Sequence, residues 1–194
     1  MIRALLLVLL LALSATGLRA EPAMLKDGDV LRGHFVQERH MQGFAHPIRS
    51  EGSFVVAPGR GLIWRAETPF AVTTVVTPAG LVQSVEGTET TRLAATRLPF
   101  LSRLYDMMAG ALGGDWRALD GVFAITRTAD QIVLVPSKPD DPTAAQIAGI
   151  TARLGRFVEA VEIRKPGGDF DRLTFTAQSL NTRPLDAAEA AMLK

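Results

Sequence analysis

Leu31–Trp64 reads LRGHFVQERHMQGFAHPIRSEGSFVVAPGRGLIW, and its pattern of side chains indicates a sheet. Alternation places side chains on one face of a β-strand, and the apolar residues that fall mostly at alternate positions are Leu31, Phe35, Phe54, Leu62 and Trp64. The polar residues between them suit a solvated face, namely Arg32, Arg39, Ser53 and Arg65. Pro58-Gly59 predicts a tight turn, because proline presets φ and glycine accepts a positive φ. The stretch therefore predicts strand, loop, strand, turn and strand.

Similar strands continue outward from this stretch. Short Gly- and Pro-containing turns separate the segments, which is typical of an antiparallel meander. Residues 147–154 fit either a helix or a strand, and we favour a strand. The predicted strands cover residues 31–41, 49–57, 60–67, 70–77, 81–86, 88–94, 121–128, 131–137, 147–154, 158–164 and 171–178. The fold class is therefore mainly β (α+β), in one domain over residues 21–194.

Two segments have the period of a helix instead. Residues 98–112 place apolar side chains at i, i+3, i+4 and i+7, which predicts an amphipathic helix ended by Gly113-Gly114. This helix either packs on the sheet as core or forms a movable cover over an apolar cavity. At the other end of the chain, Asp186 followed by Glu189 is a capping-box pattern. It predicts a short helix over 186–193.

The N-terminus has the pattern of a secretory signal. Arg3 precedes the apolar run Ala4–Leu13, and small residues follow. We expect cleavage after Ala20, with Ala15 and Gly17 as alternatives, and an uncleaved anchor is the other interpretation. The run is shorter than the roughly 20 residues that span a bilayer. The sequence has no cysteine. We therefore expect an exported domain that has no disulfides and carries no lipid on an N-terminal cysteine.

Charge and motifs argue against several function classes. Of the 21 Lys and Arg, two lie in the predicted signal, which leaves 19 against 20 Asp and Glu. This near-neutral balance, without a basic block, argues against nucleic acid as a partner. His34, His40 and His46 lack the acidic or cysteine neighbours that would complete a metal site. No nucleophile elbow, P-loop or carboxylate pair indicates an enzyme.

An ordered series of short motifs resembles the LolA-type outer-membrane lipoprotein carriers. The motifs are FVQ at 35–37, GSF at 52–54, PGRGLIW at 58–64, TP at 68–69 and TPAG at 77–80, and the similarity covers residues 31–180. The resemblance implies an incomplete antiparallel β-barrel whose concave apolar face is covered by helices. It also implies a monomeric periplasmic carrier, without cofactor or metal, that binds acyl chains of lipoproteins or other lipid cargo. An inner-membrane transporter would be its donor and an outer-membrane receptor its acceptor.

The sequence departs from that family in three places. After cleavage at Ala20 only about ten residues would precede Leu31, where the family has a longer N-terminal helix. Ala57 stands where the family has an arginine before the turn proline, and the chain ends in a short helix. These differences favour a divergent paralogue that handles another lipid, a lipid-linked pigment or a glycolipid. Two further hypotheses remain. One is a lipid-sensing module similar to periplasmic anti-sigma regulators, and the other is an enzyme or lipid-modifying accessory protein.

The candidate ligand-binding residues follow from the assignment of faces. From the sheet, the predicted lining of an apolar cavity is Phe35, Phe54, Leu62, Trp64, Phe70, Val72 and Val76. From the covering helix it is Leu101, Leu104, Met108 and Leu112. The alternative for each of these residues is ordinary core packing.

Overall fold

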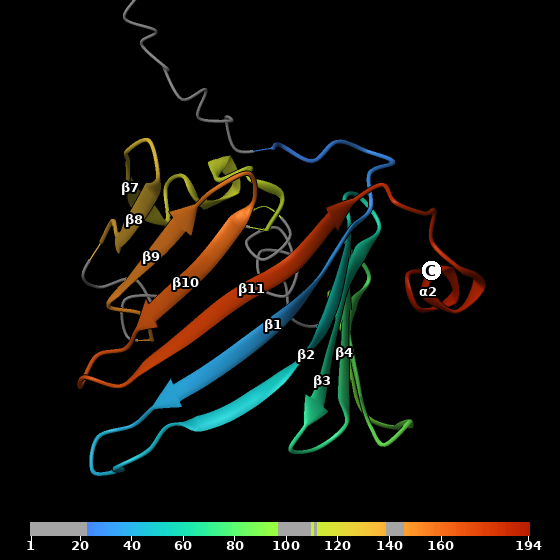
Figure 1. Ribbon diagram of the computed structural model, residues 1–194, viewed down its shortest axis with the longest axis horizontal. Coiled ribbons are helices and arrows are strands. Elements are labelled where there is room, and N and C mark those ends of the chain that lie inside the picture. The colour runs from blue at the N-terminus through green and yellow to red at the C-terminus, as the bar shows by residue number, and fades with distance from the viewer. Residues whose placement is uncertain (1–22, 97–109, 111, 139–145) are drawn as a thin grey trace, which may run out of the picture.

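A computed structural model describes residues 23–96, 110, 112–138 and 146–194, and it consists mainly of one antiparallel sheet (Figure 1). The sheet contains every predicted strand, with bounds that differ by a few residues at most. The strands are β1 (Leu31–His40), β2 (Ile48–Ala57), β3 (Gly61–Thr68), β4 (Val72–Thr77), β5 (Gly80–Val85), β6 (Thr88–Ala94), β7 (Phe123–Arg127), β8 (Gln131–Pro136), β9 (Gly149–Leu154), β10 (Val158–Arg164) and β11 (Phe170–Leu180).

Two meanders make up the sheet. The order is β6-β5-β4-β3-β2-β1-β11-β10-β9-β8-β7, so each half follows the chain and the halves join where β1 pairs with β11. That joining ladder runs from Leu31 opposite Leu180 to His40 opposite Phe170. The first and last strands in the order, β6 and β7, are not paired with each other. This open order confirms the predicted incomplete antiparallel barrel.

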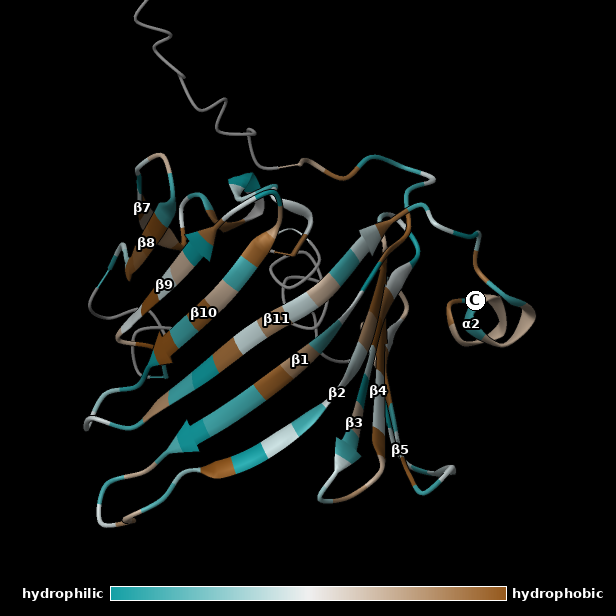
Figure 2. Cartoon of the chain, in the orientation of Figure 1, coloured by the Kyte–Doolittle hydropathy of each residue, from teal (hydrophilic) through white to brown (hydrophobic). Residues whose placement is uncertain are grey.

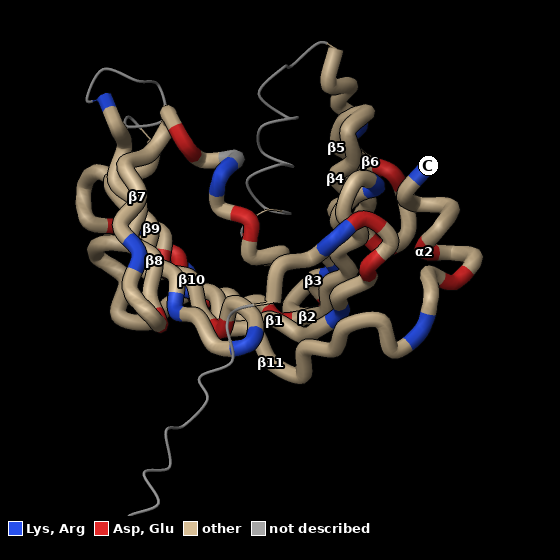
Figure 3. Tube along the Cα trace, turned by 90° about the horizontal axis from the view of Figure 1, so that it is seen from above, with Lys and Arg blue, Asp and Glu red and all other residues tan. Residues whose placement is uncertain are grey.

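The sheet curls into a trough. Seen from above, β7 to β10 form one wall, β4 to β6 form the other, and β1, β2 and β11 form the base (Figure 3). Four strand pairs contain a register shift, namely β1 with β11, β2 with β3, β5 with β6, and β9 with β10. An extra residue in one strand bends it and increases its twist. In β11 that residue is Ala177, whose φ of 50° lies in the left-handed region.

The larger hydrophobic core lies on the concave face. Apolar and polar residues alternate along β10 and β11 (Figure 2), which separates an apolar face from a polar one. Side chains from both walls and from the segment after the predicted long helix meet there. The core includes Leu31, Phe35, Phe54, Leu62, Leu112, Trp116, Leu119, Phe123, Ile132, Leu134, Leu154 and Phe175. A 3₁₀ turn at Arg117–Leu119 brings Trp116 and Leu119 into this core.

A second, smaller core lies on the convex face under the C-terminal helix α2 (Ala187–Met192). Its buried members are Val30, Val55, Ala57, Ile63, Val75 and Leu193, with Leu185 packed against them. The capping box predicted from Asp186 and Glu189 is present in both directions. Because the end of β2 and the start of β3 are covered on both faces, residues 54–57 and 61–63 are buried without alternation.

The convex core is closed by an ion cluster that the sequence did not indicate. The Glu189 carboxylate accepts hydrogen bonds from Arg32 at 2.6 Å and from Arg183 at 3.0 Å. Arg32 also donates to the carbonyl oxygens of Arg183 and Pro184. The prediction of a solvated Arg32 is therefore wrong, because the C-terminal segment folds back over β1 and covers it.

Most of the predicted helix over 98–112 lies outside the described residues. Gly110, Leu112 and Gly113 are helical, and Gly114 follows with a φ of 80°, in the manner of a helix-ending glycine.

In the part of the chain that the structure describes, no helix is long and apolar enough to cross a membrane.

Candidate functional site

Four aromatic rings form the centre of the concave face. Phe35 stacks on Trp64, with 3.8 Å between ring centroids and 25° between planes. Phe175 packs edge-on against Phe54 at 5.6 Å and against Trp64 at 6.2 Å. The rings come from four neighbouring strands, β1, β2, β3 and β11. Aromatic pairs in such geometries contribute about 0.5–1.5 kcal/mol beyond the burial of their surface.

Two glycines make room for these rings. Gly33 lies opposite Phe54, and a Cβ at Gly33 would sit 2.7 Å from the Phe54 ring. Gly52 lies opposite Phe35, and a Cβ there would sit only 1.8 Å from the carbonyl oxygen of Arg65. The base of the trough therefore depends on backbone positions that carry no side chain.

Half-buried apolar side chains extend from this cluster along β11 and onto the wall formed by β7 to β10. Leu173 pairs across the ladder with Val161, and both contact the concave core. Ile125 and Ile150 lie opposite the buried Leu134, one on each side of it, in the next cross-strand row of the same face. We call Ile125, Ile150, Val161 and Leu173 the wall patch. It provides apolar surface that core packing does not fully bury.

A charged group lies at the end of the wall patch. Asp171 is buried, and its carboxylate accepts hydrogen bonds from Arg39 and Lys165, each at 2.8 Å. Burial by itself raises the pKa of Asp171, but the hydrogen bonds from Lys165 and Arg39 outweigh it, and the net effect is a lowered pKa. Asp171 thus stays ionised at neutral pH and joins the β10–β11 hairpin to β1.

Most of the predicted cavity residues lie together on the concave face. Phe35, Phe54, Leu62 and Val76 are at most 2% exposed, whereas Trp64 and Val72 are half-buried. Leu112 is buried in the same core. The nearly complete burial of the first four indicates packed core, whereas the wall-patch residues, like Trp64 and Val72, keep part of their apolar surface exposed. Alternation contained part of this signal, because Ile125, Ile150 and Leu173 each lie two residues from a buried apolar residue of the same strand. Val161 does not, since a register shift between Val158 and Ala160 interrupts the alternation in β10.

The prediction that Phe70 begins a strand of the concave sheet is wrong. This residue lies in the turn between β3 and β4, before the first residue of β4, and it is 70% exposed. The ladder between these strands ends at Ala66 opposite Val72, so Phe70 belongs to neither strand. The other three candidates, Leu101, Leu104 and Met108, lie outside the described residues.

The histidines show no convergence on a metal site. His34 is exposed on β1, and the His40 ring stacks on Phe170 with 4.2 Å between centroids. Across the described ranges, no group of three or more His, Asp or Glu side chains is placed to hold a metal ion.

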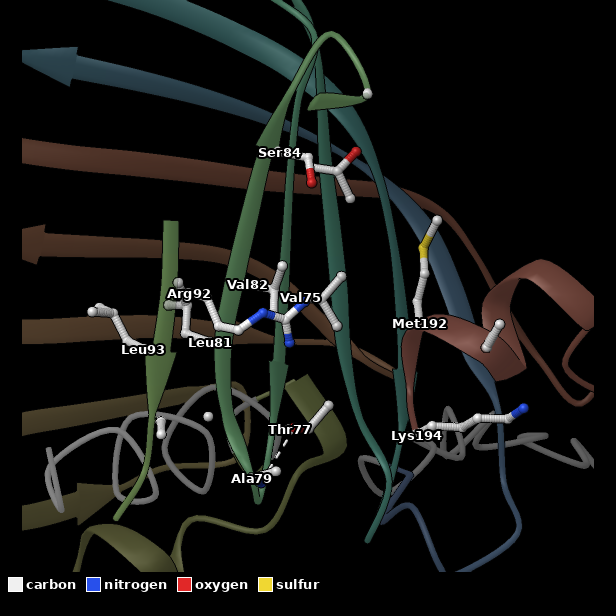
Figure 4. A pocket seen from close by; sticks show the side chains of 15 residues that line it. Val75, Thr77, Ala79, Leu81, Val82, Ser84, Arg92, Leu93, Met192 and Lys194 are labelled. Atoms are coloured by element: carbon white, nitrogen blue, oxygen red, sulfur yellow. Dashed lines mark hydrogen bonds between the residues drawn. The ribbon is translucent and has the colours of Figure 1, made fainter. Parts of the chain in front are cut away.

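Sequence reasoning missed a groove on the convex face (Figure 4). It has a volume of about 450 Å³ and lies between β4, β5, β6 and the end of α2. Val75, Val82 and Met192 contribute apolar surface, while Arg92 and Lys194 are the charged side chains that line it. The groove joins segments that are far apart in the sequence, so alternation within a single strand could not reveal it.

Comparisons with known proteins found matches among solved structures. No family model matches the chain, and no curated protein matches it. A LolA superfamily protein from Nitrosomonas europaea superposes with a TM-score of 0.43 at 10% identity, covering 91% of this chain and 94% of the other. An outer membrane lipoprotein-sorting protein domain from Vibrio parahaemolyticus gives 0.42 at 9% identity, with 88% and 94% covered.

A third solved structure is the MucA/MucB complex of Pseudomonas aeruginosa. It superposes with a TM-score of 0.38 at 14% identity and covers 86% of this chain but 57% of the other.

Proposed function

We propose that this protein is an exported carrier that holds an acyl chain of a lipoprotein or another lipid against the concave face of its sheet. The observation that supports this best is the wall patch. Four half-buried apolar side chains lie beside a packed aromatic base, in a trough whose outer strands β6 and β7 are not paired with each other. Concave, mainly apolar surface with a few polar groups at its edge is typical of small-molecule sites.

The energetics of lipid transfer fit such a surface. Each CH₂ group removed from water stabilises binding by about 0.8 kcal/mol. A soluble carrier must therefore offer apolar contact along much of an acyl chain. An open sheet can do this and still release its cargo to a partner with a better site. The functional cycle that we propose begins at an inner-membrane transporter and ends at an outer-membrane receptor, with the signal over residues 1–20 directing export.

The test is to identify what co-purifies with the protein when it is isolated gently from its own host. Native mass spectrometry followed by lipid extraction would detect bound cargo. Val161→Glu places a charge in the wall patch and should abolish co-purification of acylated cargo. Ala160→Glu is the matched control, because Ala160 is the next residue of β10 and is opposite Thr174, on the other face.

The expected result is acylated cargo in the wild type and in Ala160→Glu, and none in Val161→Glu. Equal cargo in both variants would contradict a site on the concave face. A wild-type protein that carries no lipid but retains one stable protein partner would contradict the carrier and favour a regulatory module. Circular dichroism of both variants separates loss of binding from loss of fold.

A further inference from the structure

The convex face contains an apolar row with an arginine at each end. Reading across the ladders from β1 to β6, the directly opposed residues are Arg32, Val55, Ile63, Val75, Val82 and Arg92. These residues share one face because they are cross-strand neighbours in register. Each half of the row therefore combines apolar side chains with an arginine, which is Arg32 in one half and Arg92 in the other.

The half of the row near Arg32 is already occupied by the C-terminal segment. Leu193 and Leu185 pack on Val55, Ile63 and Val75, and the Glu189 carboxylate binds Arg32 at 2.6 Å. The C-terminal segment therefore shows which groups this surface binds. Apolar side chains pack on the valines and the isoleucine, and a carboxylate forms an ion pair with the arginine.

The half near Arg92 is the groove of about 450 Å³ (Figure 4). Val75 and Val82 form its floor, and Met192, which is 42% exposed, borders it on the side of α2. Its volume falls within the range of roughly 300–1,000 Å³ that is typical of small-molecule sites. The groove is continuous with the surface under α2, since Val75 belongs to both.

The charges around the groove are complementary to an anion. Arg92 and Lys194, its charged lining side chains, are both cationic. Arg92 is paired with Glu89, but both side chains are exposed, at 66% and 44%. The pair is bidentate, but water and salt screen it because both side chains are exposed, so the Arg92 guanidinium can exchange Glu89 for an anionic group of a ligand. The hydroxyl of Thr73 adds a polar group to the lining.

We propose that this groove is a second binding site, for a small amphipathic anion with a single alkyl chain and a carboxylate or phosphate head. The head lies at Arg92 and Lys194, and the alkyl chain lies over Val75 and Val82 against Met192. The site is on the face of the sheet opposite to the wall patch. It depends on the ladder register and the position of α2, and it does not rest on the proposed carrier function.

Binding can be followed at the groove itself through the methyl group of Met192. The full protein, labelled with ¹³C at the methionine methyl groups, is titrated with dodecanoate, dodecyl phosphate, dodecyltrimethylammonium and inorganic phosphate. The Met192 signal is assigned with Met192→Leu. Dodecanoate and dodecyl phosphate should shift this signal saturably, whereas the cationic amphiphile and phosphate alone should not.

Arg92→Gln should weaken the binding of dodecanoate by about tenfold or more, the effect expected from loss of a hydrogen bond to a charged group. Arg127→Gln is the matched control, because Arg127 is exposed on β7, at the opposite end of the strand order. Equal binding by the two variants would overturn the proposal. So would a Met192 signal that phosphate alone shifts, or one that stays unchanged in dodecanoate.

The same titration distinguishes this site from the concave one. Dodecanoate bound only in the trough would change the fluorescence of the half-buried Trp64 and leave Met192 unshifted. That outcome overturns the groove site and leaves the proposed carrier function standing. A Met192 shift that persists in Val161→Glu supports the groove even if the wall patch binds nothing.

Discussion

Phe35 and Trp64 stack on each other, 3.8 Å between ring centroids, although β2 lies between the strands that carry them. The residue of β2 opposite Phe35 is Gly52. Because glycine has no side chain, the two rings can meet across the middle strand. The stacking of Phe35 on Trp64 therefore depends on the absence of a side chain at Gly52.

Gly52→Ala should destabilise the protein by about 3 kcal/mol or more, the upper end of the usual cost of overpacking. The added Cβ would lie 1.8 Å from the carbonyl oxygen of Arg65, a backbone atom that cannot move without opening the β2–β3 ladder. Urea unfolding measures the change. Gly149→Ala is the control, because its nearest atom would be 3.4 Å away. A similar loss for both variants would contradict this role of Gly52.

Glu189→Gln should lower stability at neutral pH by about 3 kcal/mol. The hydrogen bond from Arg32 is the largest cause that lowers the pKa of Glu189, from its usual 4.5 to about 2. A lowered folded pKa contributes stability above the unfolded pKa, and this contribution is lost as the pH falls. The difference in the free energy of unfolding between the wild type and Glu189→Gln should therefore disappear as the pH falls from about 4.5 to about 2.

Unfolding curves for wild type and Glu189→Gln at a series of pH values would test this. Glutamine can still occupy the capping box at the start of α2, so the variant isolates the effect of charge. A stability difference that stays constant from pH 7 to pH 2 would show that the carboxylate does not act through its ionisation.

Asp171→Asn should lower stability at neutral pH by about 1–2 kcal/mol, because two charge-assisted hydrogen bonds are weakened. The effect is moderate since Arg39 and Lys165, at 48% and 35% exposed, can turn to water. The lowered pKa of Asp171 means that this stability is present above its unfolded pKa and is lost on acidification. Hydrogen exchange should become faster in the β10–β11 hairpin, and unchanged protection there would contradict the assignment.

Phe70→Ser should change stability by no more than about 0.5 kcal/mol, as is usual for exposed positions. Leu62→Ala, on the same predicted list, should cost about 2–5 kcal/mol because Leu62 is fully buried. Thermal unfolding of the two variants compares them directly. Comparable losses would mean that the turn containing Phe70 packs against other parts of the molecule.

The sequence predicted all eleven strands of the described sheet and one face of it. Leu31, Phe35, Phe54 and Leu62 were placed together by alternation alone, and the structure confirms that they share one core. The capping box of α2 was equally visible, because Asp186 and Glu189 are three residues apart. Phe70 was misplaced because alternation was extended across a turn, although Thr68-Pro69 precedes it.

Alternation and turn residues thus determined the strands, their order along the chain and the apolar face of each, because these depend on neighbours within a few residues. Tertiary structure alone decided that β1 pairs with β11, that Glu189 meets Arg32, and that α2 leaves a groove beside Arg92. Each of these contacts joins residues about a hundred or more positions apart. Their geometry depends on sheet register and curvature, which local patterns do not specify.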